Sequence, residues 1–174
     1  MTIPILETER LILRGPTLSD FAAYAARGSD PSFMRHMGDG MPRSEEESWS
    51  SFLRLAGLWP ILGFGSWIVE DKASGAAAGS AGYIERKRDR GPDLKDIPEM
   101  GWGIAAGFEG RGYATEALGA TLQWGRERFG AARVIAVVNE ENLPSIRVAE
   151  KCGFREFKRD LSAGRPRIYF DRML

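Results

Sequence analysis

The residues whose types and spacing carry the clearest chemistry form a glycine-rich run, EGRGYATE, at residues 109–116. The run leads into a predicted long helix, and the first backbone N–H groups of a helix have no partner within it. The helix macrodipole makes that end positive, and glycine lets an anion approach the backbone without a Cβ in the way. Because Arg111 adds a charged donor, the run predicts a pyrophosphate site. A tight turn that only requires glycine is the open alternative.

A second run, NLPSIRVAEKCGF at residues 142–154, combines a short predicted helix with polar groups at its start. Asn142 is a helix-capping residue type, and Pro144 suits the first helical turn, where its missing N–H costs nothing. Gly153 is typical of the position just after a helix. The run therefore predicts a helix whose first turn presents Asn142 and Ser145.

The elements that must position these two runs alternate between strands and helices. Strands are predicted at residues 11–13, 66–70, 76–85, 99–104, 134–138, 154–160 and 168–171, and helices at 19–28, 44–60, 113–129 and 142–152. Ser44 and Glu47 form a capping box, and Gly57 and Pro60 weaken the end of that second helix. The order predicts antiparallel strands first and then one strand–helix–strand unit with parallel strands, which is an α+β or α/β architecture.

Composition bounds the class of protein. The 174 residues suit one domain, 1–174, and the 24 basic residues balance the 24 acidic ones. Zero net charge counts against a general nucleic-acid binder. One cysteine, Cys152, and one histidine, His36, exclude an internal disulfide and an all-Cys/His structural zinc site. We expect a cytoplasmic protein without metal, since no signal peptide or apolar run of membrane-spanning length is present.

A dinucleotide fingerprint is a rival interpretation of the glycines. Residues 101–106, GWGIAA, fit the G-x-G-x-x-A pattern, and Glu140 follows the next strand, where an acid would bind a ribose. The pattern belongs in the first unit of a multi-unit parallel sheet, whereas here it lies past the middle of the chain. A nicotinamide-binding protein is therefore the weaker alternative.

Four motifs in order resemble the GNAT superfamily of acetyl-CoA-dependent N-acetyltransferases. They are ETERLILR at 7–14, EMGW at 99–102, GRGYATEA at 110–117 and residues 142–154. The resemblance covers nearly the whole chain and is strongest to the branch of the ribosomal-protein N-terminal acetyltransferases, the RimJ/RimL-like enzymes. It implies a GNAT fold: an α+β protein with a mostly antiparallel sheet, one splayed parallel strand pair and about four helices. One departure is Glu109, which fills a position where the family has a phosphate-binding Gln or Arg.

The resemblance also implies site residues. Acetyl-CoA would be the co-substrate, with its arm along the strand near Trp102, Gly103 and Ile104. Its pyrophosphate would lie on Gly110, Arg111, Gly112, Tyr113, Ala114 and Thr115. Glu99 is the candidate base, acting directly or through water, and Ser145 the candidate group near the coenzyme A sulfur. Asn142 is expected to cap its helix and to contact the cofactor. Tyr113 is expected to pack beside the loop, and Tyr169 is the second candidate acid.

The acceptor is expected to be a primary amine, on a protein N-terminus or a small molecule, attacked in a ternary complex. Acids near the first two helices and the loop 86–97 were candidates to attract it: Glu45, Glu46, Glu47, Asp89, Asp93 and Asp96. They are equally explained as exposed surface. A non-catalytic coenzyme A-binding regulatory domain is the second hypothesis, and a monomer and a homodimer are both compatible with the sequence.

Overall fold

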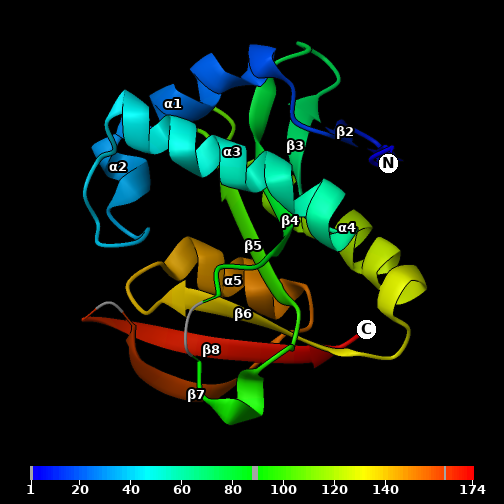
Figure 1. Ribbon diagram of the computed structural model, residues 1–174, viewed down its shortest axis with the longest axis vertical. Coiled ribbons are helices and arrows are strands. Elements are labelled where there is room, and N and C mark those ends of the chain that lie inside the picture. The colour runs from blue at the N-terminus through cyan, green and yellow to red at the C-terminus, as the bar shows by residue number, and fades with distance from the viewer. Residues whose placement is uncertain (1, 88–89, 163) are drawn as a thin grey trace.

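One mixed β-sheet carries the fold, and helices cover both of its faces (Figure 1). The computed structural model describes residues 2–87, 90–162 and 164–174. The strands in that part of the chain are β1 (Leu6–Glu7), β2 (Leu11–Arg14), β3 (Ser66–Asp71), β4 (Ala77–Ile84), β5 (Glu99–Ile104), β6 (Arg133–Asn139), β7 (Arg155–Ser162) and β8 (Arg165–Met173). They are ordered β1-β2-β3-β4-β5-β6-β8-β7. The α+β expectation is confirmed.

Five α-helices surround the sheet in the described residues, where the sequence predicted four. They are α1 (Phe21–Ser29), α2 (Pro31–Met34), α3 (Glu45–Leu62), α4 (Tyr113–Phe129) and α5 (Leu143–Lys151). Two 3₁₀ turns, η1 (Leu18–Asp20) and η2 (Pro92–Leu94), precede α1 and β5. The short elements β1 and α2 were not predicted, because two to four residues carry too little periodicity to be recognised.

Helix α3 begins as predicted and ends later than predicted. The Ser44 hydroxyl accepts the Glu47 N–H at 3.2 Å, and the Glu47 carboxylate accepts the Ser44 N–H at 2.8 Å. The helix passes through Gly57 and Pro60 and stops at Gly63, which has φ +71°. Packing of Trp59, the residue before Pro60, explains the difference: its side chain is buried to 1% exposure against other aromatic side chains. Tertiary burial thus outweighs the local cost of proline.

The larger core lies on the sheet face covered by α4 and α5. Trp59, Trp67 and Trp124 meet edge to face, with ring centroids 4.6 to 5.5 Å apart. Tyr83 reaches so far into α4 that a Cβ at Gly125 would lie 1.7 Å from its hydroxyl oxygen. That hydroxyl donates to the Thr121 carbonyl at 3.2 Å. The close contact fixes α4, and therefore its N-terminus, against β4.

The parallel pair β5–β6 is joined over a short distance. Its register consists of Glu99 opposite Ile135 and Met100 opposite Ala136. Beyond these residues β5 continues to Ile104 in pairing with β4 alone, and β6 pairs with β8. The predicted parallel unit and its splay are confirmed, and the β5 edge facing β6 has no ladder partner after Met100.

Candidate active site

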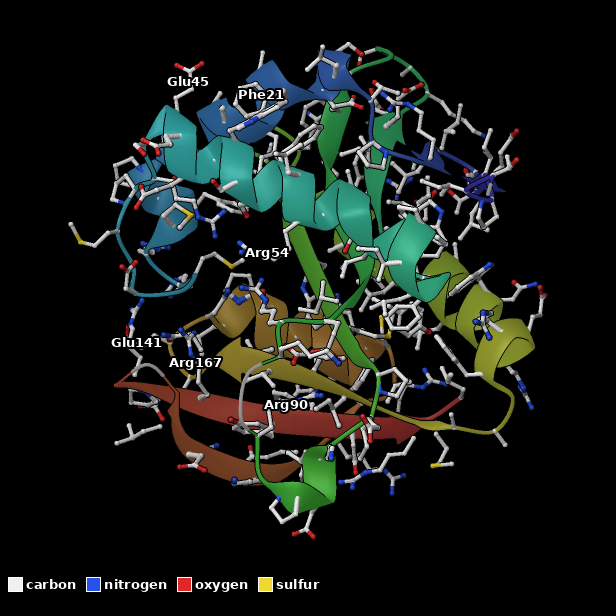
Figure 2. The ribbon with its side chains drawn as sticks, viewed as in Figure 1. Phe21, Glu45, Arg54, Arg90, Glu141 and Arg167 are labelled. Carbon is white, nitrogen blue, oxygen red and sulfur yellow. The ribbon has the colours of Figure 1, made fainter. Side chains whose placement is uncertain are left out.

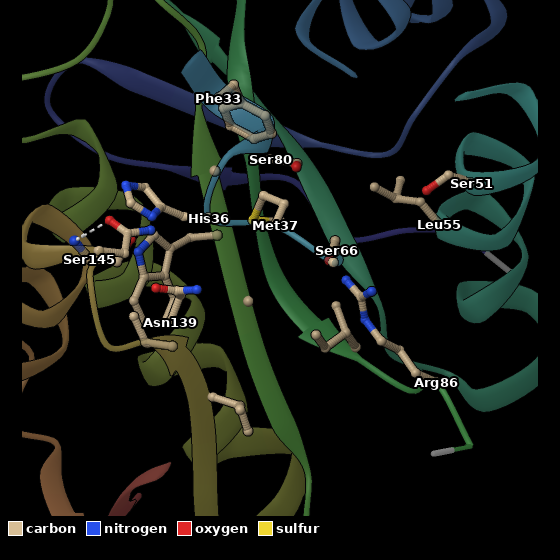
Figure 3. A pocket seen from close by; sticks show the side chains of 18 of the residues that line it. Phe33, His36, Met37, Ser51, Leu55, Ser66, Ser80, Arg86, Asn139 and Ser145 are labelled. Carbon is tan, nitrogen blue, oxygen red and sulfur yellow. Dashed lines mark hydrogen bonds between the residues drawn. The ribbon is translucent and has the colours of Figure 1, made fainter. Parts of the chain in front are cut away.

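A cavity of about 210 Å³ opens where β5 and β6 diverge (Figure 3). Glu99–Gly103 and Val137–Asn139 form its strand walls. Asn142 and Ser145 line it from the first turn of α5, while α1, α2, α3 and the segment after α2 line the other side. The splay therefore brings the candidate residues Glu99, Trp102, Gly103, Asn142 and Ser145 of the two sequence motifs to one cavity.

The glycine-rich segment Gly107–Gly112, which we call the amide loop, leads directly into α4. Gly107, Gly110 and Gly112 have φ of +86°, +73° and +82°, a conformation that L side chains rarely adopt. A Cβ at Gly107 or Gly110 would meet nothing within 4 Å, so the loop faces open space. Within the described part of the chain, no acceptor takes the N–H groups of residues 110–115. They are Gly110, Arg111, Gly112, Tyr113, Ala114 and Thr115, the predicted set.

Arg10 holds the amide loop from outside, a role that the sequence did not reveal. Its guanidinium donates to the Arg111 carbonyl at 2.8 Å and to the Glu116 carboxylate at 2.7 Å. The same group lies 4.9 Å from the centre of the Tyr113 ring. Arg111 itself is exposed, and its guanidinium lies over Phe108 at 5.4 Å. The loop is thus tied to the start of β2 while its amides stay unpaired.

Tyr113 anchors the helix rather than facing the cavity, as predicted. Its ring is buried, and its hydroxyl donates to the Asp71 carboxylate on β3 at 2.7 Å. That hydrogen bond raises the pKa of Tyr113, which makes it a poor acid. Tyr169 is also buried, and it packs with Leu94 and Ile135. Neither tyrosine lines the cavity.

Asn142 has the predicted cap geometry. Its side-chain oxygen accepts the Ser145 N–H at 3.2 Å, the bond drawn in Figure 3. The cap uses the oxygen, so the side-chain NH₂ group is the part of Asn142 that can donate to a ligand. Ser145 is half-buried on the cavity wall.

Glu99 is buried, with 5% of its surface exposed, so it is not an ordinary surface glutamate at the start of a strand. Its carboxylate lies 3.3 Å from the Arg90 guanidinium, which comes from the connection between β4 and β5 and is also buried (Figure 2). The pair holds the carboxylate at the start of β5 and on the cavity wall. The loop 86–97 thus supplies the partner of Glu99.

Two buried polar atoms of the cavity lining have no hydrogen-bond partner among the described residues. They are the indole Nε1 of Trp102 and the ring Nδ1 of His36. Buried donors and acceptors are almost always satisfied in native proteins. Together with the unpaired edge of Trp102, Gly103 and Ile104 and the free amides of the loop, they show that the splay and the amide loop fit a long polar ligand.

His36 lines the cavity from the segment after α2. Arg167 on β8 donates to the carbonyls of His36 and Gly38 at 3.1 and 2.7 Å and so holds this segment in place. Burial lowers the pKa of His36, and the neighbouring Arg35, Arg165 and Arg167 add to this shift while Glu141 opposes it. Cys152 is a small buried side chain, as predicted.

The acids considered as an attraction for a cationic amine do not line the cavity. Glu45, Glu46, Glu47, Asp93 and Asp96 are exposed or half-buried elsewhere, and Asp89 lies outside the described residues. Figure 2 shows Glu45 pointing away from the molecule. Glu45, Glu46 and Glu47 lie in the first turn of α3. Acids at this end of a helix are stabilised by its unpaired N–H groups, and these three side chains face solvent. The cavity is instead lined by Arg27, Arg43, Arg86 and Arg167, which the sequence did not single out.

Residues 10–155 match the family model of the acetyltransferase (GNAT) domain. The chain belongs to the GNAT acetyltransferase family. It is 38% identical over 167 residues to an uncharacterised N-acetyltransferase of Bacillus subtilis, YnaD, across 91% of this chain and 89% of that relative. The GNAT domain also resembles the crystal structure of an acetyltransferase from Agrobacterium tumefaciens, with TM-score 0.81 and 29% identity over 99% and 95% of the two chains.

A third similarity concerns the fold of this GNAT domain. RimL, a ribosomal L7/L12 alpha-N-protein acetyltransferase solved in complex with coenzyme A, superposes with TM-score 0.79 over 98% of both chains. Its sequence identity is 15%, so the similarity is one of architecture. In the described residues, no group of His, Cys, Asp and Glu is placed to hold a metal ion, and no helix could span a membrane.

Proposed function

We propose that this GNAT domain transfers the acetyl group of acetyl-CoA to a primary amine by direct attack within a ternary complex. The observation that carries the proposal is the splay of β5 from β6 beside a loop of unpaired amides. The amides and the positive end of α4 suit the pyrophosphate, and the open edge of Trp102–Ile104 suits the amide-containing arm. Coenzyme A bound to RimL, a protein of the same fold, supports this assignment.

The residues of this chain supply binding and proton transfer. Bound acetyl-CoA would supply an activated thioester. The acceptor nitrogen bonds to the acetyl carbon, the carbon–sulfur bond breaks, and the thiolate takes up a proton. A backbone N–H of β5 would stabilise the negative oxygen of the transition state. Ser145, half-buried near the end of the arm, is our candidate for the group that contacts the sulfur.

Glu99 is our candidate for the base. The acceptor attacks as a neutral amine, so its ammonium form must first lose a proton, and a carboxylate at the cavity wall would accept that proton directly or through one water. Arg90, whose guanidinium lies 3.3 Å away, holds the carboxylate in place on the cavity wall. Asn142 contributes its side-chain NH₂ group to the arm while its oxygen caps α5.

A non-catalytic coenzyme A-binding domain is the competing function, since the same loop and splay would serve it. A nicotinamide-dinucleotide reader is less favoured, because one parallel pair provides a single unit and not the repeated units of that fold. We also place the protein in the cytoplasm, as a RimJ/RimL-like enzyme that requires no metal. We leave its state, monomer or homodimer, open in this proposal.

Calorimetric titration with acetyl-CoA, followed by a thiol-release assay over a panel of amines, tests the proposal. We expect binding of acetyl-CoA and release of one thiol for each acetylated amine. Absence of heat and of a thermal shift at millimolar acetyl-CoA would overturn it. Binding without thiol release for any amine would favour the non-catalytic function, and tighter binding of NADH than of acetyl-CoA would favour the dinucleotide reader.

A further inference from the structure

Two arginines on the helical side of the cavity, Arg27 of α1 and Arg43 before α3, form what we call the arginine wall. Both line the cavity together with Ser51 and Ser80. The amide loop does not line it. The positive charge of this wall is therefore not part of the proposed pyrophosphate site, and it faces the acceptor side of the splay.

The hydrogen-bond partners of Arg27 in the described part of the chain are all neutral. It donates to the Gly103 carbonyl at 3.2 Å and to the Ser80 hydroxyl at 3.0 Å, and it lies about 5 Å from the Tyr24 and Phe33 ring centres. Guanidinium has five N–H donors, so part of its donor capacity is unused in the described residues. Burial lowers the pKa of Arg27 to about 10, Tyr24 opposes that shift and Arg43 adds to it. Arg27 therefore stays cationic at neutral pH without an anionic partner.

Arg43 repeats this pattern at the cavity mouth. It is half-buried and donates to the Ser51 hydroxyl at 3.3 Å. Arg43 and Ser51 also line a neighbouring surface hollow, together with Glu46, Glu47 and Arg54. No ion pair joins Arg43 to an acid in the described part of the chain. Arg43 thus stands where a small molecule would pass from the hollow into the cavity.

The cavity carries an excess of positive charge. Four arginines line it, and Glu99 is the acid among its described lining residues. Glu99 is already paired with Arg90, which does not line the cavity. Two neighbouring guanidinium groups without a carboxylate between them are costly to bury, because like charges repel and desolvation is uncompensated. A bound anion would remove that cost, and a carboxylate matches the planar guanidinium with two parallel hydrogen bonds.

We propose that the acetyl acceptor is a small amine that also carries a carboxylate, as an amino acid does, and that Arg27 and Arg43 bind this carboxylate. The assignment rests on the proposed acetyl transfer, since it names the substrate class of the same site. The amine would then lie in the same cavity as Glu99, whose carboxylate is the acid among the described lining residues. The cavity volume of about 210 Å³, which the end of the acetyl-CoA arm would share, favours a small acceptor.

The test compares matched acceptors that differ only in the carboxylate. Each amino acid of a panel is paired with its decarboxylated amine, its carboxamide and its aminophosphonate. Titration into the coenzyme A-saturated protein measures binding, and thiol release measures turnover. We expect the carboxylated member of at least one set to bind about 10- to 100-fold more tightly than its uncharged counterparts, as for loss of a charge-assisted hydrogen bond.

Variants locate the effect. Arg27→Met and Arg43→Gln are each expected to remove most of this preference by raising the acceptor Kd and KM, with a smaller change in kcat. Arg27→Lys should restore part of it, since it keeps the charge and loses the planar geometry. Arg126→Gln, an exposed arginine on α4, is the matched control and should behave as wild type. Acetyl-CoA affinity is measured for every variant, because Arg27 also contacts the Gly103 carbonyl.

The outcomes separate the two proposals. Equal binding of carboxylated and uncharged partners, or a preference that survives both Arg27→Met and Arg43→Gln, would overturn the carboxylate site. Tighter binding of the aminophosphonate would overturn the carboxylate as the preferred anion. A carboxylate preference in binding without any thiol release would instead contradict acetyl transfer and leave the anion site supported.

Discussion

The amide loop at the start of α4 and the arginine wall of α1 and α3 both offer positive charge to a ligand, and they are built in opposite ways. The loop uses backbone N–H groups of consecutive residues, 110–115, whose conformation is fixed by glycines with positive φ. The wall uses side chains 16 residues apart in sequence, Arg27 and Arg43, which meet Ser51 and Ser80 from two further elements.

Because of this difference, the two regions should tolerate different kinds of substitution. A backbone site depends on the absence of Cβ atoms, so it is disrupted by adding atoms at Gly110 or Gly112. A side-chain site depends on particular guanidinium groups, so it is disrupted by removing them. In the proposed roles, the loop would accept any phosphate, whereas the wall would select a carboxylate by the geometry of its guanidinium donors. We therefore expect cofactor binding and acceptor choice to respond to different mutations.

The largest effect is expected for Gly112→Trp. A side chain at φ +82° is strained and would fill the space beside the free amides, so acetyl-CoA affinity should fall about 1,000-fold. Titration calorimetry measures the loss. Gly119→Ala is the control, since a Cβ at this α4 position meets nothing within 4 Å and its affinity should match wild type. Unchanged binding by a folded Gly112→Trp protein would contradict the role of the amide loop.

Glu99→Gln is expected to have the second largest effect, because Glu99 would act on the reaction itself and not on binding at the amide loop or the arginine wall. Loss of a general base should lower kcat about 100-fold at neutral pH while acetyl-CoA affinity changes little. Arg90→Met is the matched variant, and steady-state kinetics with a thermal melt compare the two. Equal loss of turnover and of cofactor affinity in Glu99→Gln would indicate that the buried ion pair serves the fold alone.

Variants of Asn142 distinguish its two proposed roles, capping α5 through the side-chain oxygen and contacting acetyl-CoA through the NH₂ group. Asn142→Ala should cost about 1 kcal/mol of unfolding free energy through the lost cap and weaken acetyl-CoA binding about 10-fold. Asn142→Asp keeps the capping oxygen and removes the NH₂ donor, so it should retain stability and lose affinity. Urea unfolding and calorimetry provide the two readouts. Wild-type affinity in both variants would assign Asn142 to the cap only.

The smallest effect concerns His36 on the helical side of the cavity. Its pKa is lowered in the folded protein, so below the usual value of 6.5 the unfolded chain takes up the proton first. The contribution to stability is therefore complete above about pH 6.5 and is lost as the pH drops from there to the lowered pKa. His36→Gln should remove this slope in urea midpoints between pH 7 and 5. An identical slope in both proteins would show that another group is responsible.

Residues close together in the sequence were predictable. The capping box at Ser44, the bounds of α4, the cap at Asn142 and the amide loop all follow from contacts within a few residues. Glu99 and Ser145 were placed by resemblance to the family, and the splay between β5 and β6 puts both on one cavity. The passage of α3 through Pro60 was not predictable, because burial of Trp59 against Trp67 and Trp124 decides it.

The sequence by itself determined the order of the longer strands and helices, the glycine-rich turn at the start of α4 and the exclusion of an internal disulfide. These depend on local dihedral preferences, caps and composition. Only the tertiary structure decided that Arg27 and Arg43 face one cavity, that Arg90 partners Glu99, and that the acids of α3 face outward. The charge of a residue does not reveal where its side chain lies in the folded protein. The packing of α1 and α3 against the splayed sheet decides which charged side chains face the cavity.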